Sequence, residues 1–342
     1  MGRRIRATLQ PLIARPGARY RCFGDGLCCT DVHGLGPISE AELHQMRSID
    51  PEGAAYAEDF EDRMLCAAAD GGCVFLLPNG YCRVHVEQGE PMKPDGCRRF
   101  PLGLVATPRG GRITTEHRCP CRTLGERPAI DPGAVIEALT DADGDMDPEL
   151  EVKKVRLGIR EKISFEQWEA IEAELLGQLA RGRSPAKLLE AAPFPKLSRT
   201  SWYAQAHVLL GARDGSQFGA ALGWFADTIL HLIDGRPARP PARPWAAAFD
   251  RAEARSPVER KAREVINDWI ADEIWSLGWN EDSSFAHTRV ELATRLAIAE
   301  DIVARLRKLG LRQDRAAAEA VMIVEIVGES EHWAGIVDKM RF

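Results

Sequence analysis

The sequence lacks several features that would assign it to a common class. No stretch of the 342 residues approaches the roughly 18 consecutive apolar residues of a membrane span. The first residues are rich in arginine but have no continuous apolar core and no small-residue cleavage site, so they do not predict a secretory signal. We therefore expect a cytoplasmic protein without a membrane span. The net charge of −6 argues against a general nucleic-acid partner.

Common catalytic motifs are also missing. The chain has no P-loop, no nucleophile elbow and no G-x-G-x-x-G after an expected strand. It also lacks the C-x₃-C-x₂-C run of radical S-adenosylmethionine enzymes. These absences leave the reaction, the catalytic residues and the oligomeric state open.

Cysteine is absent from residues 122–342, whereas all nine cysteines lie in residues 22–121. Eight of them form a pattern that predicts metal ligation: Cys22, Cys28, Cys29, Cys73, Cys82, Cys97, Cys119 and Cys121. In a reducing compartment such a group indicates metal binding rather than disulfides, and the odd total agrees with this. The ninth, Cys66, is expected to be a small buried apolar residue.

Eight thiolates suit two four-cysteine zinc sites, or an iron–sulfur cluster together with one structural zinc. Cys28 and Cys29 are adjacent, so they are expected to serve two sites or two corners of one cluster. His85 and His117 lie near cysteines and are accessory candidates, while His33 is a weaker one. Nearby arginines, such as Arg98 and Arg122, would balance the negative charge or simply lie on the surface.

Composition divides the chain into four parts. We expect a basic segment at 1–21, a cysteine-cluster domain at 22–122, a linker at 123–148 and a helical domain at 149–342. A proline-rich spacer at 235–248 interrupts the last part, since proline cannot continue a helix. The expected fold class is α+β, predominantly α: a small irregular metal domain with a short β-hairpin, then an all-α domain.

Within the cysteine-cluster domain, Ser39 and Glu42 form a capping box that predicts a helix after Ser39. A second helix is expected over 56–69. Pro78-Asn79-Gly80 predicts a hairpin between 73–77 and 81–84, which would bring Cys73 and Cys82 together. A further strand is expected at 112–116.

Apolar residues at helical spacing follow the linker. They predict helices within 149–182, starting at 184, and over 198–210, 217–233, 256–277, 284–308 and 312–328.

The cysteine blocks resemble the CxxCxxCC cysteine-cluster family, also called the YkgJ-like zinc- or iron-chelating domain. The resemblance spans residues 22–121 and consists of C-x₅-C-C, G-x-C-x-F-L, G-x-C-x-V-H, K-P-x-x-C-R-x-F-P-L and C-x-C. The chain departs from the family name at position 25, where Asp25 stands in place of a third thiol. Asp25 would then supply an oxygen ligand or leave an open position.

The resemblance implies a metal-binding protein with a [4Fe–4S] cluster or zinc, and we favour the cluster. The family includes flagellin lysine-N-methylases, whose helical region resembles residues 263–306. It therefore also implies, as an alternative, methyl transfer from S-adenosylmethionine to lysines of a protein substrate such as flagellin. Asp268, Glu273, Glu281 and Asp282 are candidate bases by residue type alone. A zinc-stabilised interaction protein is a further alternative.

Overall fold

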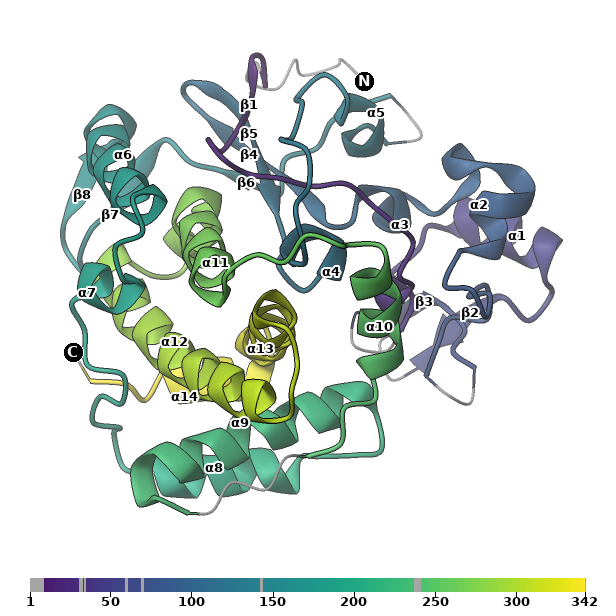
Figure 1. Cartoon of the computed structure of the whole chain (residues 1–342). Helices are drawn as coiled ribbons and strands as arrows, with labels where there is room; N and C mark the ends of the chain where they lie inside the picture. The colour runs from purple at the N-terminus through teal and green to yellow at the C-terminus, as the bar shows by residue number, and fades with distance from the viewer. Residues whose placement is uncertain are drawn as a thin grey trace.

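The computed structural model describes residues 9–341 except 31, 32, 34, 59, 60, 69, 70, 142, 143 and 237–240. Its described part is mostly helical with short strands, which confirms the expected α+β, predominantly α class (Figure 1). The strands are β1 Leu12–Ala14, β2 Ala54–Ala57, β3 Asp62–Leu65, β4 Leu102–Thr107, β5 Gly110–Thr115, β6 Leu150–Glu151, β7 Lys154–Arg156 and β8 Lys162–Ser164. The α-helices are α1 Glu40–Ile49, α2 Arg83–Gln88, α3 Asp95–Arg99, α4 Pro120–Thr123, α5 Ile136–Leu139, α6 Phe165–Ala180, α7 Pro185–Leu189, α8 Trp202–Gly211, α9 Gln217–Asp234, α10 Ala246–Ala254, α11 Ala262–Ser276, α12 Phe285–Lys308, α13 Gln313–Gly328 and α14 Glu331–Val337. Short 3₁₀ turns cover Leu27–Cys29, Glu90–Met92 and Gly278–Asn280.

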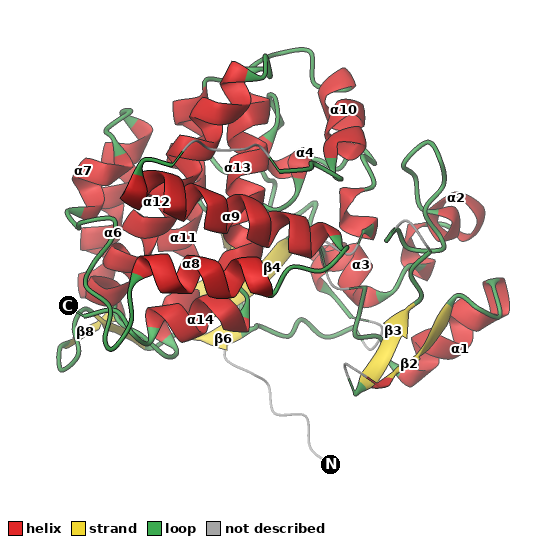
Figure 2. Cartoon of the chain, turned by 90° about the horizontal axis from the view of Figure 1, so that it is seen from below, coloured by secondary structure: helices red, strands yellow, loops and turns green. Residues whose placement is uncertain are grey.

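The helical body is built around α13. Every residue of α13 from Asp314 to Val327 is buried, because α9, α11 and α12 all pack against this helix (Figure 2). A helix that is apolar on nearly all sides is stable only in such a central position. The expected helices correspond to α7, α8, α9, α11, α12 and α13, while α10 and α14 were not predicted.

Residues 149–182 were expected to be helical, but only part of this stretch forms a helix. Its first part forms β6 and the antiparallel pair β7–β8, and only α6 is helical. Val155 is buried between exposed or half-buried neighbours, which is a strand alternation rather than a helical one. Ser164 and Gln167 then form the capping box that begins α6.

A four-stranded mixed sheet with the order β1-β5-β4-β6 packs against α11 of the helical body, while α10 of that body lies directly against the cysteine-rich region (Figure 1). The expected strand at 112–116 is confirmed as β5, which pairs with β4 as a hairpin. The segment expected to be a linker packs on this sheet, since Ile130 and Leu139 are buried with Leu104 and Ile113.

The cysteine-rich region has a small core of its own around Met46, Phe75 and Val84. The capping box of Ser39 and Glu42 is confirmed at the start of α1. The helix expected over 56–69 is wrong for its described residues, because Ala54–Ala57 and Asp62–Leu65 pair as the antiparallel strands β2 and β3. Ala54 and Leu65 are opposite one another on the paired strands, and both side chains face the core. A single helix would not place these two residues side by side.

Among the helices that the structure describes, none combines the length and the apolar character that crossing a membrane requires.

Candidate metal centre

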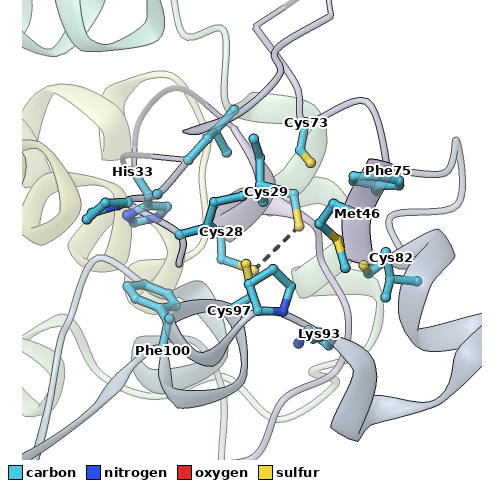
Figure 3. A pocket seen from close by; sticks show the side chains of 18 of the residues that line it. Cys28, Cys29, His33, Met46, Cys73, Phe75, Cys82, Lys93, Cys97 and Phe100 are labelled. Carbon is cyan, nitrogen blue, oxygen red and sulfur yellow. Dashed lines mark hydrogen bonds between the residues drawn. The ribbon is translucent and has the colours of Figure 1, made fainter. Parts of the chain in front are cut away.

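Five of the eight predicted cysteines line one cavity of about 250 Å³ in the cysteine-rich region. We call it the thiol cavity, and its thiols belong to Cys28, Cys29, Cys73, Cys82 and Cys97. Figure 3 shows Cys28 and Cys29 in the middle, Cys73 and Cys82 on one side, and His33 and Phe100 on the other. The Sγ atoms of Cys28 and Cys29 are 4.0 Å apart. Apolar residues, among them Met46 and Phe75, form much of the remaining wall.

Backbone contacts between two loops set the positions of these thiols. The Cys73 N–H donates to the Cys29 carbonyl at 2.7 Å, which fixes the first cysteine block against the second. Gly26 and Gly80, with φ of +81° and +87°, allow the loops to approach closely. A Cβ at Gly80 would lie 2.9 Å from the Gly24 carbonyl oxygen and 3.1 Å from that of Asp25. Helix α10 supports the same loop, since Arg251 Nε donates to the Asp25 carbonyl at 2.8 Å.

Replacing Gly80 with alanine should therefore lower the free energy of unfolding by about 2 kcal/mol, through positive-φ strain and overpacking together. Gly310 is the matched control, because its φ of +88° is similar but a Cβ there meets no atom within 4 Å. Urea denaturation of both variants measures the difference. Equal losses for Gly80→Ala and Gly310→Ala would show that the two loops are not in close contact.

The turn at Pro78-Asn79-Gly80 was predicted to join two strands, and this is only partly correct. Leu76 and Cys82 form an isolated antiparallel bridge, and the Leu77 N–H donates to the Tyr81 carbonyl at 2.9 Å. The return segment then becomes α2 instead of a strand. The turn nevertheless brings Cys73 and Cys82 together as expected, because both line the same cavity.

The other three cysteines lie around a buried aspartate. The Cys121 thiol donates to Asp25 Oδ2 at 2.6 Å, and Asp25 is only 3% exposed. Cys22 and Cys119 both hydrogen-bond to Cys121 through their side chains. We call Cys22, Cys119, Cys121 and Asp25 the Asp25 group. Asp25 thus lies against the Cys121 thiol, although among the described residues no three of the four ligand atoms in this group all lie within 4.8 Å of one another.

Cys28 lies between the two groups. Its charge acts on Cys22 and Asp25 on one side and on Cys97 on the other. The vicinal pair therefore stands at the junction of the thiol cavity and the Asp25 group.

Crowding by neighbouring thiols, together with burial, raises the pKa of three thiols of the cavity, those of Cys28, Cys73 and Cys97, in the metal-free chain. Burial raises the pKa of the Cys97 thiol to about 12; Lys93 opposes this rise and the nearby Cys28 and Cys73 add to it. Burial likewise raises the pKa of Cys73 to about 11, against a hydrogen bond from the Phe75 amide. A bound cation would reverse this balance, because it stabilises the thiolate form.

Amide N–H groups point at sulfur atoms in three places. The Phe23 N–H donates to Cys121 Sγ at 3.2 Å, and the Gly24 and Phe75 amides donate to Cys22 and Cys73. Such bonds favour the thiolate and tune a bound metal.

The histidines differ from the expected assignment. His85 is exposed on α2 and does not line the thiol cavity. His33, which we ranked as the weaker candidate, lines that cavity, is 5% exposed and has no hydrogen-bond partner at either ring nitrogen among the residues that the structure describes. Burial, and then Arg118, hold its pKa well below the ordinary value, so the ring is neutral and able to ligate a metal. The sequence signal was only its place four residues after Cys29.

His117 is buried beside a different set of groups. Its nitrogens lie 3.6 Å from Asp272 and 4.0 Å from Asp268. Among the described residues, these three side chains form the group whose possible metal-ligand atoms all lie within 4.8 Å of one another. Both carboxylates are already paired with Arg15 and Arg122. A cation there would face two buried arginines, so these residues do not fit a metal site.

The positively charged side chains near the cysteines also differ from those that the sequence led us to expect. Arg122 is fully buried and is bound by Asp268 and Asp272 rather than by thiolates. Arg98 and Arg99 pair with Asp95 and Glu149. The cations that do line the thiol cavity are Lys93 and Arg118. Lys93 was missed because nothing in its local sequence distinguishes it from a surface lysine.

The remaining candidates lie elsewhere. Cys66 is half-buried and outside the thiol cavity. Glu281 and Asp282 are exposed, and Glu273 accepts from Trp269 and pairs with Arg295. Asp268 is held ionised: burial alone would raise its pKa, but Arg122 and Arg15 hold the pKa well below the ordinary value. Such a carboxylate is a poor proton acceptor, so Asp268 is not a fitting general base.

The distances between the cysteine sulfurs bear on the choice between zinc and an iron–sulfur cluster, which the sequence left open. Four sulfurs bound at 2.3 Å to one tetrahedral zinc lie about 3.8 Å apart. Among the described residues, no three cysteine sulfurs lie within 4.8 Å of one another. Zinc would therefore require the thiols to close in, whereas a polynuclear cluster occupies a wider space between its ligands. The residues present fit the larger group better.

No family model, curated protein or solved structure matches the chain.

Proposed function

We propose that this protein is a metalloprotein whose thiol cavity holds an iron–sulfur cluster of the [4Fe–4S] type. The observation that carries the proposal is that five thiols line one cavity, while no three cysteine sulfurs of the described residues all lie within 4.8 Å of one another. Cysteine thiolates are the usual ligands of such clusters. The orphaned nitrogens of His33 provide one further ligand or hydrogen-bond donor in the same cavity.

The surroundings support a bound anionic cluster. A cluster with several thiolate ligands is negatively charged, and Lys93 lines the cavity to balance it; Arg118 also lines the cavity but is already paired with Glu116 and Glu329. The thiolates together raise the pKa of Lys93 above its ordinary value, although burial alone would lower it. The apolar wall around Met46 and Phe75 limits access of water, which governs the reduction potential of a cluster.

The Asp25 group is proposed as a separate ligand set of three thiols and one carboxylate. A carboxylate is a harder and more readily exchanged ligand than a thiolate, so a metal held here would have one exchangeable position. A structural zinc bound by Cys₃Asp, as expected beside a cluster, would require these ligands to move closer together, since among the described residues no three of their ligand atoms all lie within 4.8 Å of one another.

Metal and acid-labile sulfide analysis of anaerobically purified protein tests the proposal. We expect about four iron and four sulfide ions for each chain, with visible absorption that disappears on reduction or exposure to air. Colourless protein containing stoichiometric zinc and no sulfide would overturn the iron–sulfur assignment. Protein without stoichiometric zinc or iron would overturn the proposal that it binds a metal.

The methyltransferase and interaction-protein alternatives stay predictions that rest on the resemblance and on the thiols. Incubation with labelled S-adenosylmethionine and flagellin tests the first. Transfer of label to lysine would support it, and absence of both binding and transfer would count against it. Retention of the fold by metal-free protein would argue against zinc as a structural staple.

A further inference from the structure

Lys93 is a half-buried cation in the wall of the thiol cavity, and within the part of the chain that the structure describes it has no carboxylate partner. The other cation of the wall, Arg118, is paired with Glu116 and Glu329. Figure 3 shows Lys93 beside the cavity together with the labelled thiols. Burying a charge without a partner is costly, so the content of the cavity is expected to supply the missing negative charge.

Two carboxylates adjoin the segment that carries Lys93, and both are engaged with other groups. Glu42 accepts from the backbone N–H of Ser39 at 2.7 Å and from that of Asp95 at 2.6 Å. The Asp95 carboxylate pairs with Arg98 on the same helix. Neither carboxylate therefore neutralises Lys93, and its charge is left to the thiol cavity.

The backbone on both sides of Lys93 is tied to α1. Gln45 Nε2 donates to the Met92 carbonyl at 2.7 Å, and the Asp95 N–H donates to Glu42 on the same helix. These contacts fix the point from which the lysine side chain extends. A charge that is held in place before its partner binds needs little rearrangement to stabilise that partner.

The ammonium group of Lys93 stays charged in this position. Burial alone would lower the pKa of Lys93, but the charges of Cys28 and Cys97 raise it above the ordinary value. A cluster with thiolate ligands is anionic, and one-electron reduction adds a further negative charge to it. A fixed cation nearby attracts the reduced form more strongly than the oxidised form, since the attraction grows with charge.

We propose that Lys93 sets the reduction potential of the centre in the thiol cavity by favouring the form that has accepted an electron. This inference rests on the cluster proposed above. Lys93 acts on the cluster through its charge and is not a ligand. Its loss should therefore change the potential while iron and sulfide stay bound.

A redox titration of the anaerobically purified full chain, followed by visible absorption and electron paramagnetic resonance, tests this role. Lys93→Met should keep the native iron and sulfide content but lower the equilibrium constant for one-electron reduction about tenfold, a shift of about 59 mV to more negative potential. Lys93→Gln should shift the potential in the same direction, which guards against a packing fault peculiar to one side chain. Lys93→Arg retains the charge and should stay close to the native potential.

Arg98→Gln is the matched control. Arg98 follows Cys97 in the sequence, but it lies outside the thiol cavity and its charge is already paired with Asp95. Its replacement should therefore shift the potential less than Lys93→Met does.

A native potential in both neutral variants would overturn the inference, and so would a shift in Lys93→Arg as large as that in Lys93→Met. Loss of the cluster from both neutral variants would also overturn it, because Lys93 would then hold the cluster rather than tune it. These results are distinct from failure of the proposed function, which would appear as native protein without iron and sulfide. An intact cluster with an unchanged potential would overturn this inference alone.

Discussion

Replacement of Asp272 with asparagine is expected to lower the free energy of unfolding by about 3–5 kcal/mol. Asp272 accepts from Arg122 at 2.6 Å and from Thr115 Oγ1 at 2.7 Å, and it also binds Arg15. The Arg122 guanidinium is completely buried. Without Asp272, two buried arginines would share the single carboxylate of Asp268. The change should therefore weaken the contact of β5 and α4 with α11.

Urea denaturation measures this loss, and Glu169→Gln is the control. Glu169 pairs with Arg109 at 2.9 Å, but that arginine is 58% exposed, so removing the pair should change the free energy of unfolding only slightly. If Asp272→Asn were as mild as Glu169→Gln, the buried network would not hold these elements together.

The stability of the native protein should also fall in acid because of this network. Burial alone would raise the pKa of Asp272, but Arg15 and Arg122 together hold the pKa below its ordinary value. A carboxyl with a lowered native pKa stabilises the fold above its unfolded pKa, near 3.9, and loses that contribution as the pH falls through the native value. Denaturation curves below pH 4 should therefore show a smaller difference between Asp272→Asn and the native protein than curves at pH 7.

Replacement of Cys97 with serine should remove the metal from the thiol cavity. Cys97 is at the centre of α3, and its thiol lies near those of Cys28, Cys73 and Cys82. Serine is a harder and more weakly ligating side chain, so visible absorption and bound iron should fall to background. The variant should also unfold at a lower temperature, because metal binding to the native state contributes directly to folding.

Cys66→Ser is the matched control for this loss. Cys66 lies in the same region but outside the thiol cavity, so the metal content should not change. Loss of metal in Cys66→Ser, or full retention in Cys97→Ser, would mean that the ligand set is wrong.

The sequence predicted those features that depend on local chemistry. The capping box at Ser39 begins a helix, and apolar residues at helical spacing locate α9, α11, α12 and α13. The grouping of Cys73 with Cys82 followed from turn residues. These signals are local, since each is fixed by residues a few positions apart.

Features that depend on distant partners could not be predicted in this way. His33 and Lys93 become part of the thiol cavity only when the first cysteine loop packs against the turn at Gly80. Arg122 was expected either to balance thiolates or to lie on the surface, but Asp268 and Asp272, about 150 residues away in sequence, bind it in the interior instead. The strands β2 and β3 form because their pairing covers a small core, which outweighs local helical preference.

X-ray absorption at the iron and zinc edges of anaerobically purified protein tests the central claim most directly. Thiolate ligation by the thiol cavity predicts a dominant sulfur shell at about 2.3 Å, with an additional iron–iron shell if the group is a cluster. A shell of nitrogen or oxygen alone at about 2.0–2.2 Å would contradict the claim. So would the absence of any stoichiometric metal.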